Sequence, residues 1–195
     1  MIEITTKQLN TKEYWDKVYI TERGSGKERI DGQRLYFVKT CIERFGKPYG
    51  TFLDVGCGNG EFMKKMWEEL PDIDYSGCDI ANGTIANAMA DYPNFHFRVC
   101  DAQFLSQENT TFDMVWCGET IEHLKAPQQC ISELFRVTKT GGLVFISTPL
   151  RGNNPSDEHL WMFDLMDFVN IKDGVLLDID VVCNGLSMIA CWRKK

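Results

Sequence analysis

The chain has 195 residues, of which 44% are apolar and 25% are charged, the composition of one ordinary globular domain. No run of residues approaches the roughly 18 consecutive apolar residues of a membrane span, and the first ten residues have no apolar leader, so we expect a cytoplasmic protein that does not act at a membrane. The net charge of −7 divides into +3 over residues 1–50 and −10 over the remainder, which makes nucleic acid an unlikely partner because its backbone is bound by clustered Lys and Arg.

The first 48 residues are expected to form a helical N-terminal extension. Aromatic and charged residues over 11–19 predict a short helix, after which the run 24–26 (GSG) breaks the chain. A second helix should end at Gly46, because five apolar residues before it fall on one helical face: Leu35, Val38, Cys41, Ile42 and Phe45. Trp15 and Tyr19 could either cover a bound ligand as a lid or fasten the extension to the core.

Residues 49–195 alternate between short apolar strands and helical patterns, as one compact domain. Strands are predicted over 51–55, 73–79, 95–100, 112–117 and 143–147, and helices over 61–70, 82–90 and 127–138. A helix over 160–169 and two further strands, 175–182 and 186–192, follow. Asn184 and Gly185 between these two strands are typical of a hairpin. The sequence therefore predicts an α/β fold, a Rossmann-like doubly wound sheet of seven strands, mostly parallel, with a C-terminal antiparallel hairpin and a crevice at the carboxyl ends of the strands.

The cysteines are spread along the chain, and no two of them form a Cys-x-x-Cys pair. They lie at positions 41, 57, 78, 100, 117, 130, 183 and 191. Because several occupy strand-like apolar runs, we expect reduced, buried thiols and neither a disulfide framework nor a zinc ribbon.

A glycine loop runs directly from the first strand of this domain into the following helix, over 52–61 (FLDVGCGNGE). Glycines allow a tight turn and the close approach of a ligand to the backbone. Glu61 stands where a dinucleotide fingerprint has its third glycine, and a carboxylate would repel a pyrophosphate. Asp54 instead suits a ligand that carries an ammonium and a sulfonium group. The alternative is a purely structural turn.

Two acidic residues end the next two strands. Asp79 lies nineteen residues after Gly60, where a carboxylate can accept both hydroxyls of a ribose, as in NAD or S-adenosylmethionine. Asp101, followed by Ala102, places an acceptor where the amine of an adenine could donate. The alternative for each residue is an ordinary helix cap.

Over about residues 49–150 the chain resembles class I S-adenosylmethionine-dependent methyltransferases. The similar segments are 54–60 (DVGCGNG), Asp79, the pair 101–102, 112–117 (FDMVWC) and 141–149 (GGLVFISTP). The resemblance implies S-adenosylmethionine as the cofactor, with the glycine loop at its methionine portion, the second acid at the ribose and the third at the adenine. The implied binding residues are Asp54, Gly56, Cys57, Gly58, Gly60, Asp79, Ile80, Asp101, Ala102 and Cys117.

A cluster Glu119-x-x-Glu122-His123 follows the fourth strand. If it opens a helical turn, the three side chains share one face, where they could bind a divalent cation such as Mn, Fe or Co. The cluster also resembles two metal-using groups, the ubiquinone-pathway O-methyltransferases and the 2′-O-methyltransferases of small-RNA 3′ ends. The second resemblance implies His159 as a fourth ligand. Without a metal, His123 could act as a general base with Glu119 beside it, or simply pack.

The favoured function is methyl transfer to a small-molecule acceptor, at a hydroxyl oxygen. The alternatives are a metal-dependent RNA 3′-end 2′-O-methyltransferase, which the acidic body and the loop 148–154 disfavour, and a non-catalytic S-adenosylmethionine-binding module. A nicotinamide-dependent oxidoreductase would need Gly-x-Gly-x-x-Gly or a Tyr-x-x-x-Lys pair, and neither is present. The sequence does not predict an oligomeric state.

Overall fold

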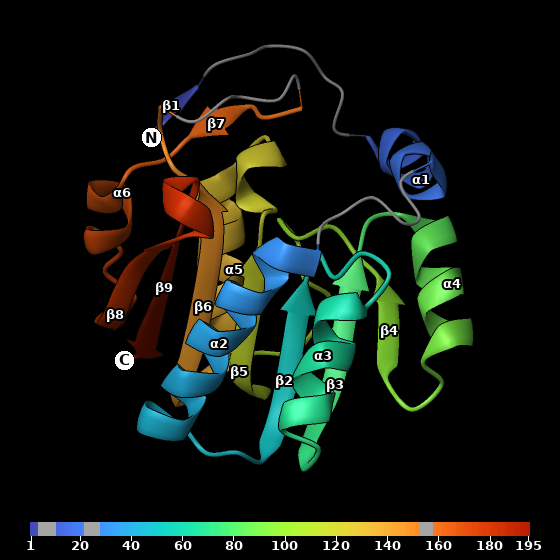
Figure 1. Ribbon diagram of the computed structural model, residues 1–195, viewed down its shortest axis with the longest axis horizontal. Helices are drawn as coiled ribbons and strands as arrows, with labels where there is room; N and C mark the ends of the chain where they lie inside the picture. The colour runs from blue at the N-terminus through green and yellow to red at the C-terminus, as the bar shows by residue number, and fades with distance from the viewer. Residues whose placement is uncertain (4–10, 22–27, 153–157) are drawn as a thin grey trace.

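The computed structural model describes residues 1–3, 11–21, 28–152 and 158–195 (Figure 1). The predicted chain break at 24–26 and most of the polar loop between 151 and 158 lie outside these residues. Within them, no helix combines the length and the apolar character needed to cross a membrane.

A seven-stranded sheet forms the centre of the molecule, with strand order β4-β3-β2-β5-β6-β9-β8. Its strands are β2 (Gly50–Val55), β3 (Ile73–Asp79), β4 (His96–Val99), β5 (Phe112–Gly118), β6 (Thr138–Pro149), β8 (Gly174–Val182) and β9 (Ser187–Lys194). The first five in the order are parallel to one another, whereas β9 is antiparallel to both β6 and β8. The predicted Rossmann-like fold with seven strands and a C-terminal hairpin is confirmed.

The hairpin between β8 and β9 turns where the sequence predicts it. Asn184 and Gly185 have φ angles of 57° and 89°, and the Leu186 N–H donates to the Cys183 carbonyl. These are the left-handed conformations that Asn and Gly adopt at the lowest energetic cost.

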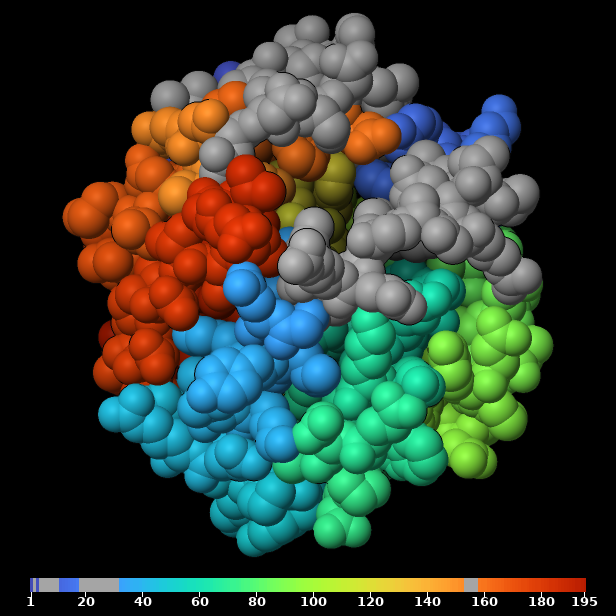
Figure 2. All heavy atoms as spheres, in the orientation of Figure 1, coloured from blue at the N-terminus to red at the C-terminus, as the bar shows by residue number. Residues whose placement is uncertain are grey.

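Neighbouring residues of the central strands face opposite sides of the sheet, and both sides are covered. Phe52 packs with α2 (Glu28–Phe45) and α3 (Glu61–Glu69), whereas Leu53 packs with α5 (Pro127–Val137). In the space-filling view of Figure 2, α2, α3 and α4 (Asn82–Asp91) adjoin one another across one face. Strands buried on both sides explain why their sequences read as continuous apolar runs.

The predicted ends of α2 and α5 agree with the structure to within one residue. The Gly46 N–H donates to the Ile42 carbonyl at 2.9 Å, which closes the last turn of α2. Pro127 is the first residue of α5, where the missing N–H of proline leaves no intrahelical bond unmade.

The predicted helix over 160–169 is wrong in its first half. Residues Trp161–Met162 form a short strand, β7, which pairs with β1 (Ile2–Glu3) at the other end of the chain. The helix α6 begins only at Leu165, because Asp164 accepts hydrogen bonds from the N–H groups of residues 166 and 167 in a capping box. Pairing with a distant segment overrides the local helical pattern here.

The helix α1 (Lys12–Thr21) lies beside α4, away from α2 (Figure 1). The carboxylate of Asp16 accepts the Gly83 N–H at 2.8 Å, at the first turn of α4. This contact places α1 across the carboxyl ends of the strands, above the site described next.

Candidate active site

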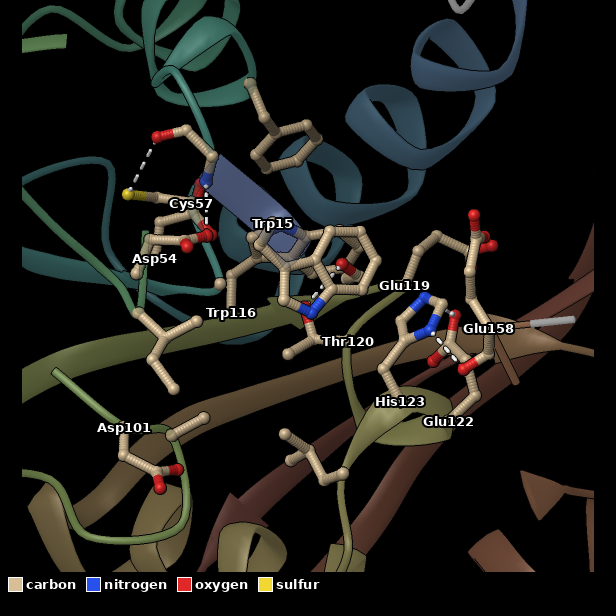
Figure 3. A pocket seen from close by; sticks show the side chains of 18 of the residues that line it. Trp15, Asp54, Cys57, Asp101, Trp116, Glu119, Thr120, Glu122, His123 and Glu158 are labelled. Atoms are coloured by element: carbon tan, nitrogen blue, oxygen red, sulfur yellow. Dashed lines mark hydrogen bonds and ion pairs between the residues drawn. The ribbon is translucent and has the colours of Figure 1, made fainter. Parts of the chain in front are cut away.

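A cavity of about 750 Å³ opens at the carboxyl ends of the parallel strands, within the size range of small-molecule sites (Figure 3). The ends of β2 and β3 and the loop after β4 line one part of it. The segment after β5 lines the other part, together with Trp15 from α1 and Arg34 from α2. The cavity therefore lies where doubly wound folds bind their ligands.

The glycine loop lies at the floor of this cavity. Gly56, Gly58 and Gly60 have φ angles of 77°, 53° and 82°, which favour glycine at all three positions. A Cβ on Gly56 would stand 2.2 Å from the Thr120 hydroxyl oxygen. The N–H groups of Gly56 and Cys57 both donate to the Cys78 carbonyl, at 2.8 and 3.0 Å. The loop is thus folded tightly against the ends of β3 and β5.

Asp79 connects the glycine loop to the start of α4. Its carboxylate accepts the Gly58 N–H at 3.0 Å and the Ala81 N–H at 2.9 Å, and it lines the cavity. It is not the N-cap of α4, which is Ala81. Burial raises the pKa of Asp79, whereas the two N–H groups act in the opposite direction. The remaining lone pairs of the carboxylate are available to a ligand.

Asp101 lines the cavity at the end of the neighbouring strand. One of its oxygens accepts both the backbone N–H of Gln103, at 2.8 Å, and the side-chain amide, at 3.1 Å. Ala102 and Ile80 lie beside it in the cavity wall. The geometry provides two carboxylates and an apolar surface on adjacent strand ends, as a nucleoside requires.

Eight of the ten residues implied for cofactor binding line the cavity. They are Asp54, Gly56, Cys57, Gly58, Asp79, Ile80, Asp101 and Ala102. Gly60 and Cys117 lie outside its lining. Gly60 caps α3 and has Phe97 against it, while Cys117 is fully buried.

The predicted common helical face for Glu119, Glu122 and His123 is wrong. Glu119 has a φ of 48°, and only Ile121–His123 form a short 3₁₀ helix, η1. The carboxylate of Glu119 turns toward Arg34, whose guanidinium lies 2.9 Å away. It also accepts the Ser147 hydroxyl at 3.1 Å. Burial and the charge of Glu122 raise the pKa of Glu119 to about 7, while Arg34 opposes this shift.

Glu122 is 1% exposed and lines the cavity. Its Oε2 accepts the Thr148 hydroxyl at 3.0 Å, whereas no residue in the described ranges donates to Oε1. Burial raises the pKa of Glu122 to about 7. A buried carboxylate oxygen without a donor is energetically unfavourable, which indicates that a ligand completes this environment.

His123 lies beside Glu122 in a defined tautomer. Its Nδ1 is 3.1 Å from the Glu158 carbonyl oxygen, which can only accept, so Nδ1 carries the proton. In the neutral form of the ring the lone pair is therefore on Nε2, which is 3.8 Å from Glu122 Oε1. Trp15 contacts the ring edge-on at a centroid distance of 4.8 Å, and the Tyr14 hydroxyl donates to the Glu158 carboxylate. Figure 3 shows Trp15 over the middle of the cavity.

His159 is brought to this group by a backbone contact, because the Leu160 N–H donates to the Glu122 carbonyl at 2.8 Å. Its ring lies edge-on to His123, with centroids 4.9 Å apart. Burial and the neighbouring His123 lower the pKa of His159 to about 4, so the imidazole is neutral at physiological pH. Glu122, His123 and His159 each offer one ligand atom, and these atoms lie within 4.8 Å of one another. Glu119 is not part of this group.

Arg34 is the main site residue that the sequence did not reveal. It is 7% exposed and donates to the Ser187 hydroxyl at 3.2 Å in addition to its ion pair with Glu119. Its burial could have been predicted from the sequence. Arg34 is four residues before Val38 and seven before Cys41, so it lies on the apolar face of α2. A cation at such a position needs a buried partner.

Comparisons with known proteins agree with this geometry. Residues 53–146 match the sequence profile of a family described as a methyltransferase domain. A ubiquinone biosynthesis O-methyltransferase of Pseudomonas fluorescens strain Pf-5 is 34% identical over 111 residues, which cover 54% of this chain and 47% of that protein. A malonyl-[acyl-carrier protein] O-methyltransferase of Salmonella typhimurium strain LT2 is 25% identical over 116 residues, 60% of this chain and 45% of that protein.

The chain thus spans about half the length of the curated relatives it matches. Among solved structures, a chain from the complex of the Haloferax volcanii Trm112 methyltransferase activator with a methyltransferase has a TM-score of 0.75 at 14% identity, covering 92% of this chain and 97% of that one. Residues 53–146 are a methyltransferase domain of the class I S-adenosylmethionine-dependent type, with distant homology to the ubiquinone-pathway O-methyltransferases. The glycine loop in the cavity lining and the carboxylates of Asp79 and Asp101 fit the cofactor this family implies.

Proposed function

We propose that this protein transfers a methyl group from S-adenosylmethionine to a hydroxyl oxygen of a small-molecule acceptor. The observation that carries the proposal is the pair formed by Glu122 and His123. Glu122 Oε1 has no donor among the described residues, and Nε2 of His123, which is a proton acceptor when the ring is neutral, is 3.8 Å away. A substrate hydroxyl that binds there would have two proton acceptors beside it, Glu122 Oε1 and His123 Nε2.

The cofactor would be held by the part of the cavity next to the glycine loop. Asp79 is available to the ribose hydroxyls, Asp101 to the adenine amine, and Asp54 and the loop to the methionine portion. When bound, S-adenosylmethionine supplies a methyl group on a positively charged sulfur. Trp15 lies over this region and helps to exclude water from it.

The proton of the acceptor hydroxyl would pass to Glu122 or His123. A pKa of about 7 suits Glu122 to this role near neutral pH, because the group is then partly ionised and still basic. Glu119, the other predicted catalytic residue, is held by Arg34 and Ser147. We propose that it stabilises the wall of the acceptor region, the part of the cavity around Glu122 and His123.

The charges around the acceptor region favour a substrate that is neutral or cationic and can donate hydrogen bonds, and they disfavour an anionic substrate. Seven carboxylates line the cavity, Glu119, Glu122 and Glu158 among them, against two cations, Arg34 and Lys125, and Arg34 is paired with Glu119. An RNA end would bring phosphates to a body with a net charge of −10 over residues 51–195. Both relatives described above are named as O-methyltransferases, which supports oxygen as the acceptor atom.

Release of S-adenosylhomocysteine over a panel of phenols, catechols, amines and RNA 3′ ends tests the proposal. We expect turnover with a hydroxyl acceptor and at least a hundredfold lower kcat in Glu122→Gln and His123→Asn. Glu69→Gln on the outer surface of α3 is the matched control. Turnover only with amines would reject the oxygen acceptor, and cofactor binding without turnover on the whole panel would favour a binding module.

A divalent cation at Glu122, His123 and His159 is a second candidate for the same step. Besides the 4.8 Å grouping, His123 donates its Nδ1–H to a backbone carbonyl, the orientation typical of metal-bound imidazoles. Mn, Fe or Co would suit these ligands and would lower the pKa of an acceptor hydroxyl. The family match by itself does not imply a metal. Elemental analysis after incubation with Mn should give about one ion per chain in the wild type and in His96→Ala, but none in His159→Ala. A metal-free wild type would reject this candidate.

A further inference from the structure

Two cysteines, Cys78 and Cys100, each directly precede one of the cavity carboxylates. Cys78 is the last residue but one of β3, before Asp79, and Cys100 follows β4, before Asp101. The two strands are paired, and the Cys100 N–H donates to the Asp79 carbonyl at 2.9 Å. Cys100 packs against the buried cluster that contains Cys78. A covalent change at either sulfur would therefore act directly on the cofactor region.

The environments of the two sulfurs differ. Cys100 is partly exposed and lines the cavity. Its sulfur accepts the Ser106 N–H at 3.4 Å, and as a thiol it can donate to the Phe104 carbonyl at 3.4 Å or the Asp101 carbonyl at 3.6 Å. The neighbouring Cys78 and the donation from Ser106 lower the pKa of Cys100 to about 6. Cys78 is 1% exposed, and its pKa is raised by the neighbouring Cys100 and by burial. An accessible cysteine packed beside a buried one is the arrangement of a reactive and a resolving cysteine.

From this geometry we infer that Cys100 is a modification site for hydroperoxides, and that its oxidation leads to a disulfide with Cys78 that closes the cofactor region. The Cys100 thiolate attacks the peroxide, whose O–O bond breaks. The sulfur is oxidised to a sulfenic acid, and the peroxide is reduced to water or an alcohol. Cys78 then attacks the Cys100 sulfur, the S–S bond forms, the S–O bond breaks, and water leaves with the Cys78 proton.

The disulfide should displace Asp101. Cys78 lies opposite Arg98 in the register, so Cys100 is offset by two residues along the neighbouring strand. Bringing the two sulfurs to a bond length of about 2.05 Å requires the backbone at Cys100 to move toward β3. Cys100 would also lose its contact with Ser106. The consequence for the cofactor rests on the proposed function, whereas formation of the disulfide does not.

Peptide mapping of the reduced, full chain after treatment with hydrogen peroxide tests the inference. We expect a Cys78–Cys100 disulfide, and a sulfenic acid at Cys100 that dimedone traps in Cys78→Ser. The pair Cys117 and Cys130 is the control, because both of these thiols are fully buried. They should stay reduced under the same treatment. Oxidation of the control pair first, or no 78–100 linkage, would overturn the inference.

Calorimetry with S-adenosylhomocysteine gives the second readout. Oxidation should weaken binding at least tenfold in the wild type, and dithiothreitol should restore it. An oxidised wild type that binds as tightly as the reduced protein would overturn the closing of the site. If the reduced protein does not bind S-adenosylhomocysteine at all, the proposed cofactor function fails, and peptide mapping alone decides whether Cys100 is the modification site.

Discussion

The guanidinium of Arg34 lies 2.9 Å from the Glu119 carboxylate and joins α2 to the segment that follows β5. Both side chains are largely buried, the Ser187 hydroxyl accepts a bond from Arg34, and the Ser147 hydroxyl donates to Glu119. This ion pair holds one wall of the acceptor region. It also directs the Glu119 carboxylate to Arg34, outside the group that Glu122 forms with His123 and His159.

Arg34→Leu should lower the free energy of unfolding by about 2 to 3 kcal/mol, because it leaves the Glu119 carboxylate buried without its cation. Lys39→Leu on the same helix, which breaks the more exposed ion pair with Glu69, should leave it nearly unchanged. Urea denaturation measures both. In the double variant Arg34→Leu/Glu119→Gln much of the loss should be recovered, and additive losses would contradict the coupling.

Asp79→Asn should weaken S-adenosylhomocysteine binding about 10- to 100-fold, the expected loss of one or two hydrogen bonds to a charged acceptor. Asp74→Asn on the same strand is the matched control, since its side chain is exposed and lies away from the cavity lining. Isothermal titration calorimetry compares the two. Equal affinities for both variants would remove Asp79 from the binding site.

Gly56→Ala should destabilise the fold by about 3 kcal/mol or more, because a Cβ there meets Thr120 at 2.2 Å in a backbone conformation that already costs alanine about 1 to 2 kcal/mol. Gly141→Ala separates the two effects. Its φ is 80°, but no atom lies within 4 Å of the added carbon, so only the conformational cost remains. Thermal unfolding should also show partial recovery in Gly56→Ala/Thr120→Ala. A loss no larger than that of Gly141→Ala would argue against the steric explanation.

Glu122→Gln should stabilise the protein at alkaline pH while it abolishes turnover. The pKa of Glu122 rises from 4.5 to about 7 on folding, so its favourable contribution is fully present below pH 4.5 and is lost as the pH rises through 7. The charged, buried form then costs about 3 kcal/mol. The variant should therefore gain stability over the wild type progressively between pH 4.5 and 7, as measured by urea denaturation. A difference that is constant with pH would show that Glu122 is not buried as a titrating group.

The sheet and the cofactor region were largely readable from local patterns. Apolar runs predicted the central strands, because strands covered by helices on both sides are apolar on both faces. The glycine loop was predictable because a strand that turns at once into a helix needs positive φ angles. The position of Asp79 was predictable because the carboxyl ends of parallel strands meet at one edge of the sheet. The match to residues 53–146 confirms the family that these segments indicated.

Tertiary structure alone decided the partners of the acidic cluster and of the cysteines. By itself, the sequence determined which residues stand at the strand ends, because backbone conformation there depends on neighbours along the chain. The positive φ of Glu119 and its ion pair with Arg34 from α2 direct the Glu119 carboxylate toward α2. The pairing of β7 with β1 replaced a predicted turn of helix, and the bond from Leu160 to Glu122 brought His159 to His123. These contacts join residues far apart in the chain, so packing set them and no local pattern could.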